Sequence, residues 1–258
     1  MFSFAKRLVA DSPFSGPQTQ ELGENGLPIG KIDSAPTTDG RQISFVDERS
    51  TFASGGFHTD ISFEKRSAAY SILRMHTLPP CGGDTLFASA YKFYDILSPA
   101  MAAFLETLTA THSAEMFREQ SRRHGFKLHM GPRGAPENVG DEFRASHPVI
   151  RTNPVTGLKG LFVNTCFTTR INELTIDESR NLLSYLFSLQ HQCYDAHVRY
   201  CWDKNDTAIW DNRSTTHNAT FDYTELRQGD RAVCCGEAAY LDPNSLSRKE
   251  FEAKHGRI

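Results

Sequence analysis

The sequence predicts a mostly β protein with a few helices, arranged as an antiparallel sandwich or barrel. Short segments of alternating polar and apolar residues, rich in β-branched and aromatic side chains, are joined by turn-sized connections. Only a few segments place apolar residues at helical spacing. No G-x-G-x-x-G or P-loop pattern follows a strand, so the sequence does not support a nucleotide-binding α/β fold.

The composition is that of an ordinary globular protein. The chain has 258 residues, of which 39% are hydrophobic and 23% charged, with a net charge of −3. Without a long basic run or a stretch of about 18 apolar residues, we expect neither nucleic acid nor a membrane as partner. The six cysteines show no CxxC pair, and the first residues lack the apolar core of a secretory signal. We therefore expect reduced thiols and a cytoplasmic protein.

The first half of the chain predicts a loop region, a strand and a helix. Residues 1–50 are rich in turn-forming residues and predict an irregular N-terminal segment. The stretch "SAAYSILRMHTL" predicts a strand that is closed by the turn "PPCGGD". Residues 88–113 predict helix, in which Ser98 is the expected N-cap and Pro99 the first helical residue.

The second half predicts a lid, a hairpin, a helix and further strands. Residues 118–148 are polar and predict a long loop or lid insertion. "HPVIRTNPVTGLKGLFVN" predicts a hairpin with the turn "NPVTG". Residues 175–192 predict a helix, with Thr175 and Glu178 as its capping box. Three more strands are expected within 194–202, 206–212 and 230–241.

One constellation of side chains points to metal chemistry. The stretch "GGFHTDISF" places His58 and Asp60 two residues apart, on what we interpret as a strand, so both side chains point the same way. His217 lies far downstream in "DNRSTTHNATF". Two imidazoles and one carboxylate form the facial triad that binds Fe(II) in non-haem oxygenases and leaves positions open for other ligands.

Several sequence blocks strengthen this interpretation. They are "FHTDISFE", "LPPCGGDTLFAS", "LFVNTCFTTRI", "LLSYLFSLQ", "DTAIWDNRSTTHNATFDY" and "RQGDRAV". In this order the blocks, within residues 55–240, resemble the taurine dioxygenase (taurine/2,4-dichlorophenoxyacetate dioxygenase) family of Fe(II)- and 2-oxoglutarate-dependent oxygenases. The resemblance implies a double-stranded β-helix (jelly-roll, cupin-like) core with flanking helices, spanning residues 51–258.

The resemblance also implies the metal and co-substrate residues. His58, Asp60 and His217 match the iron ligands. Thr85 and Arg227 match the residues that bind the distal carboxylate of 2-oxoglutarate, for which the planar guanidinium of arginine is well suited.

The residues on the substrate side follow from the same resemblance. Arg231 matches an arginine that faces the substrate anion. The spacing from His217 to Arg227 is one residue shorter than in the family, so Arg227 and Arg231 could exchange roles. Phe57 and Phe167 are candidate substrate contacts, with a core or wall position as the alternative for each.

The N-terminal segment departs from the family pattern. No histidine precedes His58, and "GKID" stands where the family has a histidine loop. We expect a shortened N-terminus and a sheet that lacks an edge strand.

The resemblance implies an Fe(II)- and 2-oxoglutarate-dependent dioxygenase. It would use O₂ to hydroxylate an aliphatic C–H of a small organic, sulfonate-like substrate, with release of succinate and CO₂. Two alternatives stay open: a secondary-metabolite tailoring oxygenase with a larger substrate, and a degenerate, non-catalytic relative. A homo-oligomer is also expected.

Overall fold

The computed structural model describes residues 30–33, 56–124 and 128–256. Its strands are β1 (Gly30–Asp33), β2 (Ala68–Thr77), β3 (Thr85–Ser89), β4 (Thr109–Ser113), β5 (Arg144–Pro148), β6 (Ile150–Thr152), β7 (Lys159–Leu161), β8 (Thr168–Ile171), β9 (His197–Tyr200), β10 (Thr207–Asp211), β11 (Thr215–Ala219) and β12 (Gln228–Cys235). Its helices are α2 (Ala90–Asp95), α3 (Pro99–Leu105), α4 (Glu115–His124), α5 (Ile176–Gln192) and α6 (Arg248–His255), with a 3₁₀ turn at Tyr194–Ala196.

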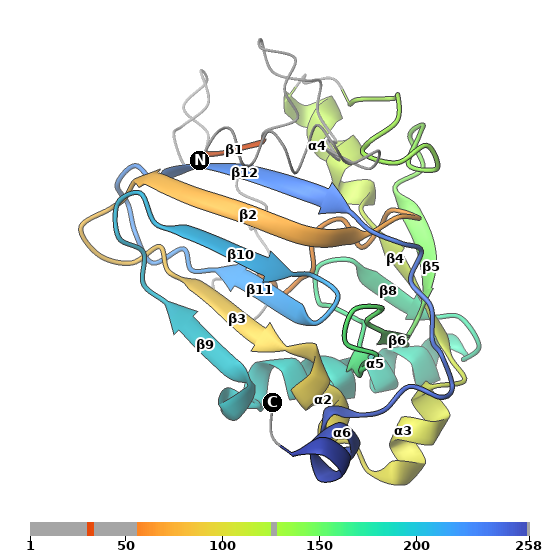
Figure 1. Ribbon diagram of the computed structural model, residues 1–258. Helices are drawn as coiled ribbons and strands as arrows, with labels where there is room; N and C mark the ends of the chain where they lie inside the picture. The colour runs from red at the N-terminus through yellow and green to blue at the C-terminus, as the bar shows by residue number, and fades with distance from the viewer. Residues whose placement is uncertain (1–29, 34–55, 125–127, 257–258) are drawn as a thin grey trace.

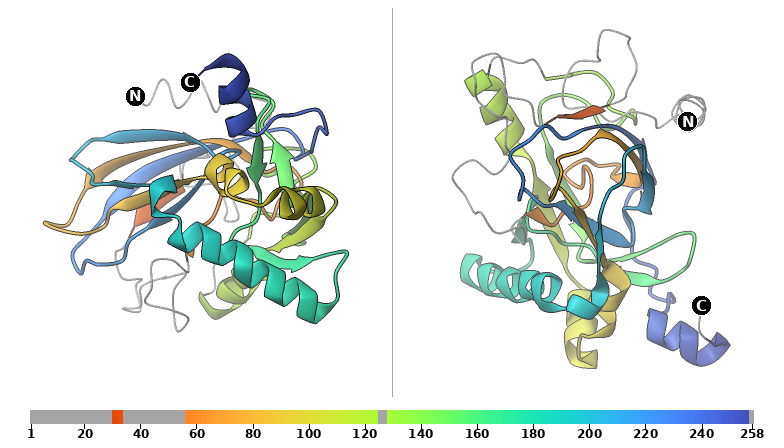
Figure 2. Two further views of the ribbon diagram at one scale, coloured as in Figure 1. Left: turned by 90° about the horizontal axis from the view of Figure 1, so that it is seen from below. Right: turned by 90° about the vertical axis from the view of Figure 1, so that its left-hand side faces the viewer.

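Two antiparallel sheets make up one end of the molecule. One has the strand order β1-β12-β2-β10 and the other the order β11-β3-β9. In Figure 1 these strands follow one another from β12 at the top to β9 at the bottom. Viewed from that end, in the right panel of Figure 2, they curve around a shared interior. The described part of the chain is therefore mostly β, as the sequence predicts.

The other end combines a smaller sheet with most of the helices. The sheet has the order β5-β4-β8, and β6 and β7 form a separate hairpin. Helix α5 packs on β8, with Leu183 and Leu186 buried in the same hydrophobic core as Ile171 (Figure 2). Because this core also includes Phe57, it joins the helical end to the segment that precedes β2.

Several local predictions are confirmed. Strand β2, the 150–161 hairpin and helix α5 form where the sequence predicts them. Ser98 caps α3, accepting a hydrogen bond from the backbone of Met101, and Pro99 is the first residue of that helix. Thr175 and Glu178 form both hydrogen bonds of the predicted capping box. These signals are local, which is why sequence alone finds them.

Three boundaries differ from the prediction. The end of the 88–113 segment is strand β4, because its backbone pairs with both β5 and β8. The predicted 118–148 loop includes most of helix α4 and, at its end, strand β5, which leaves a shorter connection between them. The last predicted strand ends at Cys235, so residues 236–241 lie outside β12.

The prediction of a missing edge strand is wrong. The "GKID" stretch forms β1, which pairs antiparallel with β12 and places Gly30 opposite Arg231. The β12 edge of the sheet is therefore covered, and "GKID" is a strand where we expected a loop. The rest of the predicted 1–50 segment lies outside the described residues.

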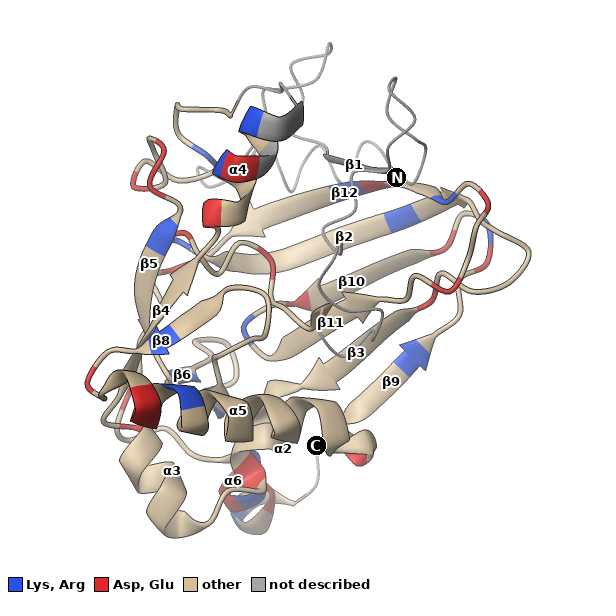
Figure 3. Cartoon of the chain, turned by 180° about the vertical axis from the view of Figure 1, so that it is seen from behind, with Lys and Arg blue, Asp and Glu red and all other residues tan. Residues whose placement is uncertain are grey.

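Both signs of charge are interspersed on helices α4, α5 and α6 (Figure 3).

Among the described residues, no helix is both long and apolar enough to cross a membrane. All six cysteines are free thiols, as the sequence predicts.

Candidate metal and 2-oxo acid site

Three of the predicted site residues meet at one point. His58, Asp60 and His217 each offer a ligand atom, and these atoms lie within 4.8 Å of one another. Asp60 Oδ1 is 3.8 Å from His58 Nε2 and 3.9 Å from His217 Nε2. Among the described residues, this is the one cluster of histidine, cysteine or acidic side chains with metal-binding spacing.

The backbone brings the two histidines together. His217 lies on β11, and His58 forms an isolated antiparallel bridge with it through two backbone hydrogen bonds of 3.0 and 2.8 Å. The two imidazole rings are 4.3 Å apart between their centroids. Because both bonds of the bridge are main-chain bonds, the pairing of the two rings does not depend on a metal.

Asp60 is held differently from the prediction. We expected His58 and Asp60 on one strand, but the bridge ends at His58 and Asp60 begins a turn. The next residue, Ile61, has a φ of 47°, which a branched side chain rarely adopts. The carboxylate therefore reaches the imidazoles through a turn and not through strand alternation.

The ring nitrogens are available in the way that a metal requires. His58 Nδ1 donates to the carbonyl of Gly56 at 2.7 Å, which leaves Nε2 as the ligand atom. His217 Nδ1 is buried without a hydrogen-bond partner. Its ring lies between Trp210 and Phe87, at centroid distances of 4.7 and 6.2 Å, so packing fixes its orientation.

The protonation states of Asp60 and His217 also suit metal binding. Burial raises the pKa of the Asp60 carboxyl, but Arg231 and the two imidazoles outweigh it and lower the pKa to about 2. Burial, with the neighbouring His58, lowers the pKa of His217 to about 3. Burial also lowers the pKa of His58, but Cys166 and Asp60 outweigh it and raise the pKa. An ionised carboxylate and a neutral His217 are the forms that bind a metal. The donor set thus fits a divalent metal such as Fe(II).

A second group of residues lies beside the triad. Thr85 on β3 pairs with Ala219, two residues beyond His217, so Thr85 and His217 share one face of the sheet. Arg227 is buried and donates from Nε to the carbonyl of Gly83 at 2.9 Å. The predicted pair of Thr85 and Arg227 is therefore joined through the "GGDT" turn.

Trp202 completes this second group. Its indole Nε1 donates to Thr85 Oγ1 at 3.0 Å. Since the hydroxyl oxygen accepts this bond, its own proton remains available for an acceptor such as a carboxylate. We did not select Trp202 from the sequence, where its only signal is an aromatic residue at the end of a predicted strand.

Arg231 is the one predicted cation that touches the triad. Its Nη1 donates to Asp60 Oδ1 at 2.7 Å, and its side chain is 31% exposed. Arg227 is instead buried beside Gly83. The two arginines therefore take different positions.

The two phenylalanines do not share one location. Phe167 packs edge-on against His58 with a centroid distance of 5.9 Å, so it borders the triad. Phe57 is buried in the main hydrophobic core and packs against His197 at 5.3 Å. Chain alternation turns Phe57 away from its neighbour His58, so its position does not support the predicted substrate contact.

Two further residues around Asp60 carry no isolated sequence signal. Ser71 and Asn212 both bond to Asp60. Asn212 belongs to the "WDNR" stretch, between Asp211 and Arg213. Ser71 is one of several small residues in the predicted strand β2.

Comparisons with known proteins agree with this geometry. Residues 11–234 match the family described as taurine catabolism dioxygenase TauD, TfdA family. An alpha-ketoglutarate-dependent dioxygenase of Penicillium shearii is 42% identical over 228 residues, covering 75% of this chain and 60% of that protein. An alpha-ketoglutarate-dependent sulfonate dioxygenase of Saccharomyces cerevisiae is 35% identical, covering 72% of this chain and 43% of its own length. The chain thus spans only about two fifths to three fifths of the length of these curated relatives.

Solved structures show the same relationship. The crystal structure of a taurine dioxygenase from Burkholderia xenovorans superposes with a TM-score of 0.66 and 26% sequence identity, covering 90% of this chain and 71% of that one. Alpha-ketoglutarate is another name for 2-oxoglutarate, the co-substrate for which Thr85 and Arg227 are candidates. The match over residues 11–234, which contains the triad and both arginines, shows that this chain belongs to the TauD/TfdA family of taurine catabolism dioxygenases.

Proposed function

We propose that this protein is an Fe(II)- and 2-oxoglutarate-dependent dioxygenase that hydroxylates an aliphatic C–H bond of a small organic substrate. The convergence of His58, Asp60 and His217 within 4.8 Å is the observation that carries the proposal. The buried Arg227 beside Thr85 adds a carboxylate-binding pair next to the metal ligands. A metal hydrolase or isomerase would not need this pair.

Each residue has a defined task in this proposal. The two imidazoles and Asp60 would hold the metal, and three protein ligands are few enough for a co-substrate to bind it as well. Thr85 would donate a hydrogen bond from its hydroxyl, and Arg227 hydrogen bonds from its guanidinium, to the distal carboxylate of 2-oxoglutarate. When bound, Fe(II) would supply the redox chemistry that couples conversion of 2-oxoglutarate and O₂ to succinate and CO₂ with hydroxylation of the substrate.

Arg231 and Phe167 support a substrate that is a small organic anion. Arg231 is partly exposed and lies against the metal ligand Asp60, where it can pair with a sulfonate, sulfate or carboxylate group. Phe167 borders His58 and offers an apolar wall. Relatives described as sulfonate and sulfate ester dioxygenases are consistent with this class. A larger substrate, as in tailoring oxygenases, remains the alternative.

The test is an anaerobic titration of the purified protein with Fe(II) and then 2-oxoglutarate. The readout is the metal-to-ligand charge-transfer band in the visible region. We expect the band in the wild type, its loss in His217→Ala, and weaker 2-oxoglutarate binding in Arg227→Ala. His255→Ala and Arg180→Ala remove the same side chains from exposed helix positions and serve as controls.

The outcomes separate the candidate functions. A band that needs His217, followed by succinate release with an alkyl sulfonate or sulfate, supports the proposal. Succinate release only with larger neutral compounds favours the tailoring alternative. A folded wild-type protein without the band contradicts the oxygenase function and leaves the non-catalytic relative.

We also propose that the two sheets around the triad form the double-stranded β-helix of this family, with residues 51–258 as one domain. The order of the strands and the superposition on taurine dioxygenases support this arrangement. A homo-oligomer and a cytoplasmic location stay predictions from the sequence.

A further inference from the structure

The carboxylate of Asp60 is enclosed in a ring of hydrogen bonds with Ser71 and Asn212. Asp60 Oδ2 accepts from Ser71 Oγ at 2.5 Å, and Asn212 Nδ2 donates to the same Oγ at 2.8 Å. The backbone N–H of Asp60 donates to Asn212 Oδ1 at 2.9 Å, which closes the ring. All three residues are almost fully buried, with at most 3% exposure. Water therefore does not replace any of these bonds.

The donors and acceptors allow only one arrangement of this ring. Asn212 Oδ1 faces two N–H donors, the Asp60 backbone and the indole of Trp210 at 3.3 Å, so the amide oxygen must lie there. The amide nitrogen therefore faces Ser71. Since Ser71 Oγ accepts from Asn212, its single proton is directed at Asp60 Oδ2.

This ring assigns different tasks to the two oxygens of the carboxylate. Oδ2 is occupied by the Ser71 proton, whereas Oδ1 faces both histidine Nε2 atoms at 3.8 and 3.9 Å and accepts a hydrogen bond from Arg231 Nη1 at 2.7 Å. The terminal torsion of an aspartate side chain has a broad energy minimum, so the rotation of the carboxylate is set by its hydrogen bonds, from Ser71 to Oδ2 and from Arg231 to Oδ1. No strand pairing restrains Asp60, because the bridge ends at His58.

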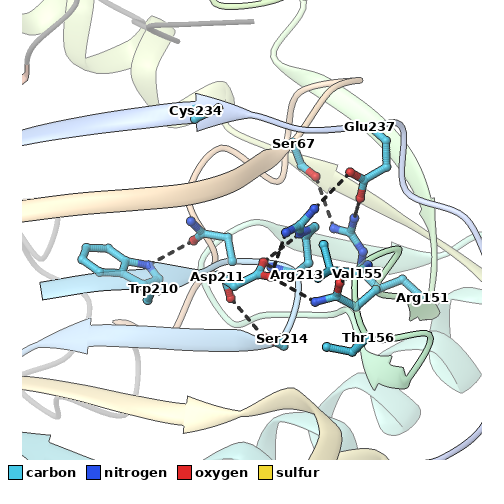
Figure 4. Close-up of polar contacts among 12 residues, drawn as sticks. Ser67, Arg151, Val155, Thr156, Trp210, Asp211, Arg213, Ser214, Cys234 and Glu237 are labelled. Atoms are coloured by element: carbon cyan, nitrogen blue, oxygen red, sulfur yellow. Dashed lines mark hydrogen bonds and ion pairs between the residues drawn. The ribbon is translucent and has the colours of Figure 1, made fainter. Parts of the chain in front are cut away.

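Asn212 is itself held in place by a network of charged residues that includes the buried Arg213 and Arg151. Arg213 bonds to both oxygens of Asp211 at 2.8 and 2.9 Å, and Asn153 donates to Asp211 Oδ2 at 3.1 Å. Glu237 joins Arg213 at 3.4 Å to the buried Arg151 at 2.7 Å (Figure 4). This network fixes both neighbours of Asn212 and so limits the movement of its amide.

We propose that Ser71 and Asn212 are positioning residues that present Asp60 to the metal through Oδ1 alone. The inference rests on the proposed metal site. By holding Oδ2 away from the two imidazoles, the ring keeps Asp60 a one-oxygen ligand and leaves the remaining positions for 2-oxoglutarate and O₂. Neither residue touches the metal, and both act through Asp60.

The experiment measures Co(II) and Mn(II) binding to the metal-free protein. Isothermal titration gives the affinity, and the visible absorption of Co(II) reports the ligand geometry. In Ser71→Ala we expect metal affinity to fall about 10- to 100-fold, as is typical when an outer partner of a metal ligand is lost, and the Co(II) spectrum to change. Asn212→Ala keeps the Ser71 bond to Asp60, so we expect a smaller loss in the same direction.

Ser179→Ala is the matched control. Ser179 is also buried, and its hydroxyl accepts a hydrogen bond from the Ile171 backbone on the α5 side of the molecule. Its loss should reduce stability without changing metal affinity or the Co(II) spectrum. Circular dichroism and thermal unfolding establish that each variant is folded.

The outcomes distinguish this inference from the proposed function. The inference is supported if the wild type binds the metal, Ser71→Ala and Asn212→Ala bind it more weakly, and Ser179→Ala binds it with unchanged affinity. Wild-type binding with unchanged affinity and spectrum in both ring variants overturns the inference and leaves the oxygenase proposal standing. A folded wild-type protein that binds neither metal overturns both.

Discussion

Arg133 and Glu64 form a buried, two-pronged ion pair that ties the loop after α4 to the turn that carries Asp60. Arg133 Nε lies 2.5 Å from Glu64 Oε1 and Nη2 lies 3.2 Å from Oε2, and the side chains are only 1% and 3% exposed. Arg133 Nη1 also donates to the carbonyls of His129 and Gly140. The segment that we predicted to be a lid is thus anchored to the interior by one guanidinium.

Loss of this ion pair should strongly destabilise the fold. Glu64→Gln leaves the buried Arg133 charge without its counter-charge, so we expect the free energy of unfolding to fall by about 3–5 kcal/mol. Urea denaturation measures the change. Asp177→Asn removes the exposed pair with Arg180, which should cost about 0–1 kcal/mol. Equal losses in the two variants would contradict the structural role of Glu64.

A methyl group at Gly83 should weaken 2-oxoglutarate binding. A Cβ there would lie 2.9 Å from Arg227 Cδ and 3.0 Å from Nε, so the guanidinium must shift. Loss of one charge-assisted hydrogen bond, about 1.5–3 kcal/mol, corresponds to a roughly 10- to 150-fold weaker affinity. The charge-transfer titration measures this affinity in Gly83→Ala.

Gly157→Ala is the control for the backbone strain. Gly157 has a φ of 70°, close to the 72° of Gly83, but nothing lies within 4 Å of its Cβ position. Both variants should lose some stability, since left-handed backbone costs about 1–2 kcal/mol for a residue with a side chain. Only Gly83→Ala should lose co-substrate affinity, and a similar loss in both would point to strain alone.

The fold should lose stability in mild acid because of His147. Burial, with the nearby Arg151 charge, lowers the pKa of His147 from 6.5 to about 4, and its Nε2 bonds to the carbonyls of Ser62 and Glu64. Between these two pH values the unfolded chain binds a proton that the folded protein does not. Stability should therefore fall by about 3 kcal/mol as the pH drops from about 6.5 to about 4.

Denaturation midpoints across this pH range measure the effect. His147→Gln should flatten the slope, although it also removes hydrogen bonds and so lowers stability at neutral pH. His255→Gln replaces a histidine at an exposed position on α6 and serves as the control variant. A wild-type slope that stays flat above pH 4 would show that the buried histidines do not control acid stability.

Metal binding should stabilise the folded protein. Mn(II) at a hundred times its dissociation constant should raise the free energy of unfolding by about 2.7 kcal/mol, because the unfolded chain lacks the assembled triad. Thermal unfolding with and without Mn(II) measures this gain. His58→Ala should abolish it, whereas His76→Ala, on β2, should keep it. Retention of the full gain in His58→Ala would place the metal elsewhere.

The sequence predicts elements that depend on local signals. Helix α5 has both its capping box and an apolar stripe, and strand β2 has turn residues at its end. Helix α4 lacks these cues, because "EMFREQSRRH" is almost entirely polar. It is fixed by tertiary contact, since Met116 and Phe117 pack against the Phe63 cluster. The same reason hides β4, whose residues form strand only because β5 and β8 pair with it.

The candidate site also combines residues that the sequence reveals with features that depend on the fold. Residue type and spacing pick out the triad, and the family resemblance adds Thr85 and the two arginines. They do not reveal that Asp60 lies in a turn, since that depends on where the bridge to His217 ends. Phe57 was predicted as either a substrate contact or a core residue, and its ring lies in the main hydrophobic core. Ser71 and Asn212 become visible only when β2 and β10 pair.

The distant contacts that complete the site and its sheet also set an order of events during synthesis. Asp60 and its partner Arg231 are 171 positions apart, and β1 finds its neighbour only in β12, so most of the chain must leave the ribosome before either contact forms. Folds dominated by such distant pairings form slowly. Iron would therefore be acquired late, by a nearly finished fold, and its uptake would serve as a readout of completed folding.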